Sequence, residues 1–130
     1  MTKLLSIRGI PGSGKSTMAR QLVQAGEYDV MVEADFFFMT EAGYKWREDL
    51  LAKAHAWCQH EVYANLLRGK DTIVSNTFIT LWQMQPYINF CKRWNIDFSV
   101  VEAKGRYQNI HNVPEEKVKN MENLWEKYDG

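Results

Sequence analysis

Short apolar runs alternate along this chain with longer stretches in which apolar residues recur at helical spacing. Four short runs are predicted to be strands: 4–8, 30–34, 72–75 and 98–102; the first is short and apolar enough to be buried. The stretches between and after them predict four helices, which begin near Lys15, Glu48, Thr80 and Pro114. An aromatic-rich connection, residues 36–47, separates the second strand from the second helix.

Glycine and proline residues mark where these helices begin or end. Gly26 and Gly69 follow the first two predicted helices, at the position where glycine commonly ends a helix. Thr80 is a candidate cap for the third helix, which Pro86 would kink or delay. Pro114 suits the first position of the last helix. The apolar face of that last helix is predicted to comprise Val118, Met121 and Trp125.

Strands that alternate with helices predict an α/β fold, with three layers around a parallel sheet of four to five strands. No repeat or linker divides the chain, so residues 1–130 are predicted to form one domain. In such sheets, ligands bind beyond the carboxyl ends of the strands. Four places follow from that rule: 9–16, Asp35, 75–78 and 104–111.

Composition and charge limit the class of protein. Sixteen basic residues balance sixteen acidic ones, which argues against a protein that coats duplex nucleic acid, but leaves open a pocket for a nucleotide or a nucleic-acid end. No apolar stretch is long enough to cross a membrane, and residues 1–8 are too short an apolar core for a signal peptide. Cys58 and Cys91 cannot form a disulfide framework, which favours two reduced core thiols in a cytoplasmic protein.

A glycine-rich loop follows the first predicted strand and matches G-x-x-x-x-G-K-[ST] in full, from Gly9 to Ser16. Its glycines allow backbone N–H groups to surround phosphate oxygens, and the helix that begins at Lys15 adds its positive dipole end. The lysine suits the β- and γ-phosphates, and the Ser16 hydroxyl suits Mg²⁺. The predicted fold is therefore the P-loop NTPase fold, with ATP and Mg²⁺ as ligands. The predicted nucleotide-binding residues are Gly9, Pro11, Gly12, Ser13, Gly14, Lys15, Ser16 and Thr17.

Two carboxylates at the end of the second strand are candidate general bases. Asp35 is predicted to face the same crevice as the loop, where it could take a proton from a substrate hydroxyl. Glu33, two residues earlier, is the competing carboxylate. The third strand, by contrast, ends in Ser75 and Asn76, where an aspartate that positions magnesium is expected. Either side chain could hold a metal-bound water or a phosphate, but neither carries charge.

Together these residues resemble the P-loop polynucleotide 5′-hydroxyl kinase family, which includes the kinase domain of the T-even phage polynucleotide kinase and small P-loop kinases labelled as AAA-domain ATPases. The resemblance covers nearly the whole chain. Its more specific part comprises Ala54-His55-x-Trp57, Ser75-Asn76-Thr77-Phe78, Trp82-Gln83-Met84 with Tyr87, and Asn109-Ile110-His111-x-Val113-Pro114 before Met121. The resemblance implies transfer of the ATP γ-phosphate to a hydroxyl. It also implies that Lys15, Ser16 and Thr17 bind the phosphates and the metal and that Asp35 is the general base.

The chain departs from the family pattern at three places. Phe38 stands where the polynucleotide kinase has an arginine that grips the substrate phosphate. Ser75 and Asn76 replace the usual aspartate, and the lid is reduced to residues 104–108. The identity of the acceptor is therefore the least specific part of what the resemblance implies.

Several further side chains have two interpretations each. Arg106, beside Gly105, is the first candidate for a cation on the transferring phosphate, and Lys104 is the second; Arg8 either joins them or pairs with a structural carboxylate. The aromatic residues of 36–46 either stack on bases or pack under their own loop. His55 and His60 are predicted to be structural, and His111 either positions the lid or contacts ligand.

The leading hypothesis is an ATP-dependent kinase acting on the 5′-hydroxyl of RNA or DNA ends, with Lys15, Asp35 and Arg106 as catalytic residues. The second is a kinase for a nucleoside, nucleotide or other small metabolite, which the neutral charge and Phe38 favour. The third is an ATP-binding switch without phosphate transfer, which the missing acid of the third strand favours. The oligomeric state does not follow from the sequence.

Overall fold

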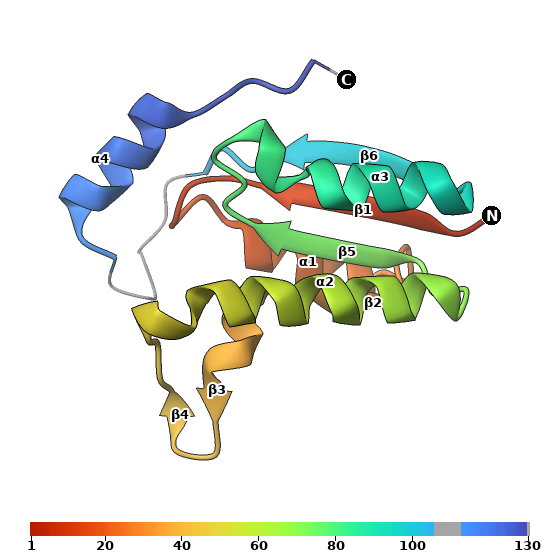
Figure 1. Cartoon of the computed structure of the whole chain (residues 1–130), viewed down its shortest axis with the longest axis horizontal. Coiled ribbons are helices and arrows are strands. Elements are labelled where there is room, and N and C mark those ends of the chain that lie inside the picture. The colour runs from red at the N-terminus through yellow and green to blue at the C-terminus, as the bar shows by residue number, and fades with distance from the viewer. Residues whose placement is uncertain (106–112, 130) are drawn as a thin grey trace.

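The computed structural model describes residues 1–105 and 113–129, and a parallel sheet of four strands forms its centre (Figure 1). The strands are β1 (Lys3–Arg8), β2 (Val30–Val32), β5 (Thr72–Asn76) and β6 (Asp97–Glu102), in the order β2-β5-β1-β6. This confirms the predicted strands and the parallel sheet. The carboxyl ends of all four strands lie at one edge, where the sequence places its candidate site residues.

Helices cover both faces of this sheet, which confirms the three layers. Helix α1 (Lys15–Gln24) packs on one face, against Leu5, Ile7 and Ile73. Helices α2 (Leu51–Leu67) and α3 (Gln85–Trp94) pack on the other face (Figure 1). Side chains of a strand alternate between the two faces of a sheet. In β1, Leu4 therefore lies on the face that α2 and α3 cover, and Leu5 and Ile7 lie on the face that α1 covers.

The buried cysteines belong to the second of these cores. Cys58 of α2 and Cys91 of α3 are both free and buried, which confirms that they are core thiols. Burial raises the pKa of the Cys91 thiol to about 11. Both side chains therefore behave as small apolar residues of the packing between the two helices and the sheet.

The connection after β2 differs from the prediction. Strand β2 ends at Val32, and Ala34–Phe38 forms a 3₁₀ helix, η1, so Asp35 lies on a helical turn and not at the end of a strand. A small antiparallel hairpin follows, with β3 (Met39–Thr40) and β4 (Gly43–Tyr44). The sequence did not predict this hairpin, because two strands of two residues each give no periodic pattern.

Three helix boundaries also differ. Helix α2 follows a separate turn, η2 (Glu48–Leu50). Likewise α3 begins at Gln85, after η3 (Leu81–Gln83). Of the two effects predicted for Pro86, a kink or a delayed start, the structure therefore shows the delayed start. Helix α4 (Glu115–Leu124) begins one residue after Pro114, which is its cap and not its first residue.

The correction with the largest structural consequence is that Trp125 lies beyond α4 and not on its apolar face. Its ring lies against the guanidinium of Arg8, with 3.9 Å between the guanidinium carbon and the ring centroid. Residue Glu126 accepts a hydrogen bond at Oε1 from the backbone N–H of Leu81, at 2.7 Å. The segment after α4 is thereby attached to the end of β1 and to η3.

Helix α4 and the β3–β4 hairpin both lie at the end of the molecule where the strands finish (Figure 1). The two elements flank the loop between β1 and α1, so they border the space in which a ligand at this edge would lie. Over the described ranges 1–105 and 113–129, the model has no helix with the length and hydropathy to cross a bilayer.

Candidate active site

The loop between β1 and α1 has a conformation that requires glycine. Gly12 and Gly14 adopt φ angles of 83° and 92°, in the left-handed region that side chains disfavour. A Cβ atom on Gly9 would lie 2.3 Å from Ser13 Oγ and 2.9 Å from the carbonyl oxygen of Ala103. The backbone therefore approaches itself so closely that the first glycine of the motif has no room for any side chain.

The same loop fits a phosphate group. The hydroxyl of Ser13 is buried and has no hydrogen-bond partner among the described residues, although its carbonyl accepts from the N–H of Gly105 at 3.0 Å. The first turn of α1 contains no acidic residue, so its free N–H groups and positive dipole end are open to an anion. An unpaired hydroxyl, a glycine cradle and a free helix N-terminus are the features expected of a site for the phosphates of ATP.

Lys15 lies between this loop and the two carboxylates that follow β2. Its ammonium donates a hydrogen bond to the carbonyl oxygen of Ile10 at 3.2 Å. Burial lowers the pKa of Lys15, while the charges of Glu33 and Asp35 raise it. The three charged groups are thus close enough to influence one another, so the loop and the segment after β2 lie near each other.

Glu33 and Asp35 have different partners. The Ser16 hydroxyl donates to Glu33 Oε2 at 2.6 Å, and Glu33 is only 5% exposed. Burial raises the pKa of Glu33, and the hydrogen bond from Ser16 opposes that shift. The structure therefore joins Glu33 to the predicted metal ligand.

Tyr44 and His55 surround Asp35, and neither role followed from the sequence. The Tyr44 hydroxyl donates to Asp35 Oδ1 at 3.0 Å, and both burial and the carboxylate raise the pKa of that phenol. Burial lowers the pKa of His55, while the charge of Asp35 raises it, so His55 on α2 also lies near the carboxylate. Tyr44 lies nine residues away across an unpredicted hairpin, so no spacing rule connects it with Asp35.

The two polar residues at the end of β5, Ser75 and Asn76, lie in different environments. Asn76 accepts a hydrogen bond at Oδ1 from the backbone N–H of Ala34, at 2.9 Å, and donates from Nδ2 to Cys58 Sγ, at 3.6 Å. The Tyr87 hydroxyl donates to the same sulfur at 3.5 Å. Asn76 therefore holds the turn that carries Asp35. Ser75 Oγ, by contrast, is buried without a hydrogen-bond partner among the described residues.

The candidate cations other than Lys15 have separate outcomes. Arg8 is 1% exposed and donates from Nε and Nη2 to the carbonyl oxygen of Phe78, at 3.1 Å and 2.6 Å. These bonds and the contact with the Trp125 ring give Arg8 a structural role. The structural interpretation expected a carboxylate as the partner of Arg8, whereas the partners in the structure are backbone carbonyls and an aromatic ring. Lys104 is exposed at the end of β6. Arg106 and His111 lie outside the described residues.

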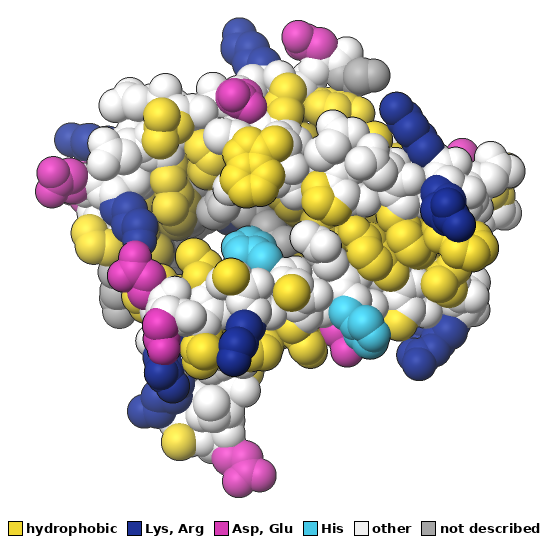
Figure 2. Space-filling model, viewed as in Figure 1, with side chains coloured by type: hydrophobic (Ala, Val, Ile, Leu, Met, Phe, Trp, Pro, Cys, Tyr) yellow, Lys and Arg dark blue, Asp and Glu magenta, His cyan; other side chains and the backbone are white. Residues whose placement is uncertain are grey.

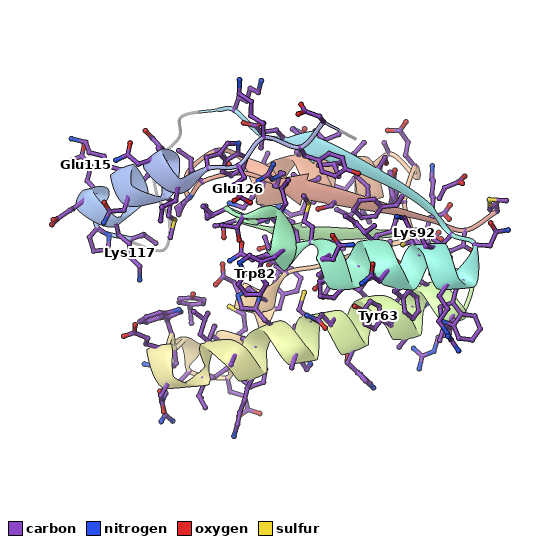
Figure 3. The ribbon with its side chains drawn as sticks, turned by 45° about the horizontal axis from the view of Figure 1, so that its top comes forward. Tyr63, Trp82, Lys92, Glu115, Lys117 and Glu126 are labelled. Carbon is purple, nitrogen blue, oxygen red and sulfur yellow. The ribbon has the colours of Figure 1, made fainter. Side chains whose placement is uncertain are left out.

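The aromatic residues of the connection divide between packing and exposure. Phe38 is 3% exposed and packs against Tyr44 and Trp46, and Phe37 packs against Trp57. Three aromatic residues near this edge of the sheet remain exposed: Phe36, Trp46 and Trp82. The ammonium of Lys117 lies 5.5 Å from the centroid of the Trp46 ring, which places α4 close to the segment after the hairpin. Figure 3 labels Trp82, which belongs to η3, and Lys117 on α4.

Removing the Tyr44 hydroxyl tests whether that group orients Asp35. We expect Tyr44→Phe to lower the kcat of the expected phosphate transfer about tenfold. A hydrogen bond to a charged group contributes about 1.5–3 kcal/mol, and the partial exposure of this bond places it at the lower end of that range. The KM for ATP is expected to stay unchanged, since the hydrogen bond that the change removes goes to Asp35 and not to the loop. Steady-state kinetics of Tyr44→Phe beside Tyr28→Phe, a control at the other end of the sheet, measures both values. An unchanged kcat would show that Asp35 does not need this partner.

A phosphate-binding loop between a central parallel strand and a helix, with the lysine and serine as described, defines a P-loop protein of the kinase type. The AAA domain family model matches residues 4–123, and the chain therefore belongs to this family. The chain is 27% identical to human NEDD4-binding protein 2 over 135 residues. That alignment covers 96% of this chain and 8% of the relative, so the chain spans a small part of that protein.

Solved structures of kinases have the same fold. The structure of the Pnkp1/Rnl/Hen1 complex contains a chain that matches with a TM-score of 0.66 and 23% identity, over 92% of this chain and 38% of that one. A gluconokinase from Sinorhizobium meliloti matches with a TM-score of 0.67 and 14% identity, over 98% and 77%. The APS kinase CysC of Mycobacterium tuberculosis matches with a TM-score of 0.60 and 18% identity, over 95% and 96%. The neighbours thus confirm the kinase-type fold, and two of them, the gluconokinase and the APS kinase, are named for different substrates.

Proposed function

We propose that this protein transfers the γ-phosphate of ATP to the 5′-hydroxyl of RNA or DNA ends. Residues 9–17 bind the phosphates of ATP, Asp35 accepts the proton of the acceptor hydroxyl, and Arg106 is the proposed cation on the transferring group. Ser16 would hold Mg²⁺, which when bound neutralises charge on the β- and γ-phosphates. Lys15 supplies further positive charge on the same oxygens.

The environment of Asp35 is the observation that carries this proposal. Asp35 lies close enough to Lys15 for its charge to raise the pKa of that ammonium, which supports a position near the phosphates of a bound ATP. The Tyr44 hydroxyl donates to Asp35 Oδ1 and so helps to hold the carboxylate in place. Glu33, the competing base, is buried against Ser16 and is less accessible to an acceptor hydroxyl.

Exposed aromatic and basic side chains around Asp35 support a nucleic-acid end as acceptor. Phe36 is 38% exposed on the same turn as Asp35, and Trp46 is 44% exposed with Lys117 beside it. Aromatic rings stack on bases whatever the sequence, at about 1–3 kcal/mol for each base. The likeness to a chain of the Pnkp1/Rnl/Hen1 RNA repair complex, at 23% identity, is consistent with this class of acceptor.

A kinase for a small hydroxyl compound is the second candidate, and Phe38 favours it. The side chain at this position is buried in aromatic packing, so it cannot grip a substrate phosphate. On the face that Figure 2 shows, Lys and Arg side chains lie dispersed among acidic ones, mostly at the margins, and form no continuous basic track. The likeness to a gluconokinase and to an APS kinase is consistent with this alternative.

The salt dependence of KM distinguishes these two acceptors. For a single-stranded oligonucleotide that is held by contacts to two phosphates, we expect KM to rise about sevenfold for each fourfold rise in salt, because counterions compete with the protein. For a nucleoside the same change should have little effect. Kinetics with a 5′-hydroxyl oligonucleotide and with the matching nucleoside, each at several salt concentrations, measures this. A flat KM for the oligonucleotide, together with efficient nucleoside phosphorylation, would favour the second candidate.

A further inference from the structure

The protein lacks an acid at the end of β5, but the structure contains a carboxylate close by. Asn76 uses both ends of its amide within the protein, on Ala34 and Cys58, so it is committed to holding the turn that carries Asp35. Cys58 belongs to α2, which places the Asn76 side chain on the α2 face of the sheet. The residue that replaces the expected aspartate therefore points away from α1 and its Ser16.

Three oxygen-bearing side chains lie on the opposite face of the sheet, the face that α1 covers. Ile73 packs against α1, and because side chains alternate along a strand, Ser75 lies on the same face two residues later. Glu33 is on this face too, since it accepts the hydrogen bond of Ser16 from the first turn of α1. The cluster of Ser16, Glu33 and Ser75 is therefore formed by α1 and by the ends of two adjacent strands, β2 and β5.

We propose that Glu33 replaces the missing acid of β5 as the carboxylate on the magnesium side of the nucleotide, with Ser75 as a neutral partner. This inference rests on the proposed nucleotide site. Mg²⁺ prefers carboxylate and hydroxyl oxygens and keeps several of its waters, which need acceptors of their own. A carboxylate offers about four acceptor positions, so the bond from Ser16 leaves Glu33 able to accept from the ion's waters or to bind the ion.

The burial of the Glu33 carboxylate and the missing hydrogen-bond partner of the Ser75 hydroxyl support a role of both residues at the Mg²⁺ site. Neither observation depends on the loop motif. A carboxylate that is 5% exposed is destabilising unless a cation or several donors compensate it, and a bound divalent cation would do so. The Ser75 hydroxyl is 2% exposed and lacks a partner among residues 1–105 and 113–129. A water molecule of the ion's shell would give that hydroxyl the hydrogen bond that the protein does not provide.

The test compares nucleotide binding with and without Mg²⁺ in four variants. We expect Glu33→Gln to raise the Mg²⁺ concentration needed for tight binding of the ATP analogue AMPPNP by about 10–100-fold, the range seen when a partner of a metal shell is removed. Binding of AMPPNP without Mg²⁺ should stay equal or become tighter, because a negative charge near the phosphates is gone. Glu33→Asp, which keeps the charge, should recover part of the Mg²⁺ effect. Glu27→Gln, the same change at an exposed position, is the control.

Isothermal titration with AMPPNP over a series of Mg²⁺ concentrations measures these values, and thermal melting verifies folding. Glu33→Gln is expected to fold, because Ser16 can donate to the amide oxygen. Ser75→Ala should raise the Mg²⁺ requirement a few-fold without loss of stability, since the unpaired buried hydroxyl is removed. A Mg²⁺ requirement in Glu33→Gln equal to that of the wild type would overturn the inference. Wild-type protein with Mg²⁺-dependent AMPPNP binding but no acceptor labelling would instead refute the proposed function and leave this inference standing.

Discussion

Replacing Asp35 by asparagine is expected to lower the rate of phosphate transfer by about 100–10,000-fold, the contribution of a positioned general base. An amide cannot take the proton of the attacking hydroxyl. The shape of the site should survive, because the asparagine oxygen can accept the hydrogen bond that Tyr44 donates to Asp35 at 3.0 Å. ATP affinity should change little, since Asp35 lies beyond the loop that binds the phosphates. Single-turnover kinetics with saturating ATP measures the loss.

A matched control is available on the same connection. Asp49 forms an exposed ion pair with Arg47, and both side chains are 62% exposed. Such pairs contribute little, so Asp49→Asn should leave both transfer and stability close to the wild type. Wild-type transfer by Asp35→Asn would show that another group is the base. A loss of transfer shared equally by Asp49→Asn would point to a general effect on folding.

Substituting alanine for Gly9 is expected to weaken ATP binding by about 100-fold or more. The new Cβ atom would lie 2.3 Å from Ser13 Oγ and 2.9 Å from the carbonyl oxygen of Ala103, so the loop has to move. Displacement by about 1 Å is enough to cost 100-fold where several groups must converge on one ligand. Equilibrium binding of AMPPNP measures the effect, and circular dichroism shows whether the fold is retained.

Gly43→Ala provides the contrast for this prediction. Gly43, unlike Gly9, has a positive φ, 104°, and an added Cβ there meets nothing within 4 Å. Its substitution should therefore reduce stability by about 1 kcal/mol through backbone strain alone and leave ATP affinity unchanged. Equal losses of ATP affinity in the two variants would mean that the close approach at Gly9 is not what forms the phosphate site.

The sheet and its layers followed from the sequence, because short apolar runs alternate with stretches at helical spacing. This held even for β6, an edge strand that is mostly exposed. The glycine-rich loop at 9–16 was also predictable, because its residues are contiguous in the sequence and form a recognisable motif. The turn η1 did not follow: Phe36, Phe37 and Phe38 form an apolar run whose burial is decided by Tyr44, Trp46 and Trp57, which come later in the chain.

The divided roles of the polar residues around the loop were also beyond sequence reasoning. Asn76 binds the backbone of Ala34, a contact between residues 42 positions apart that depends on β2 lying next to β5. Glu33 and Asp35 look equivalent along the chain, and they differ because the turn η1 begins between them. Arg8 looked like a candidate cation until the segment after α4 brought the Trp125 ring against it.

The most direct test of the proposed function is to locate the phosphate that the wild-type protein transfers from γ-labelled ATP in the presence of a 5′-hydroxyl oligoribonucleotide or oligodeoxynucleotide. The account predicts that the label is on the oligonucleotide and that nuclease digestion releases it as the 5′-mononucleotide. Labelled nucleoside monophosphate formed from free nucleosides, with no label on either oligonucleotide, would contradict the proposed acceptor. Tight binding of ATP without label on any acceptor would contradict phosphate transfer itself.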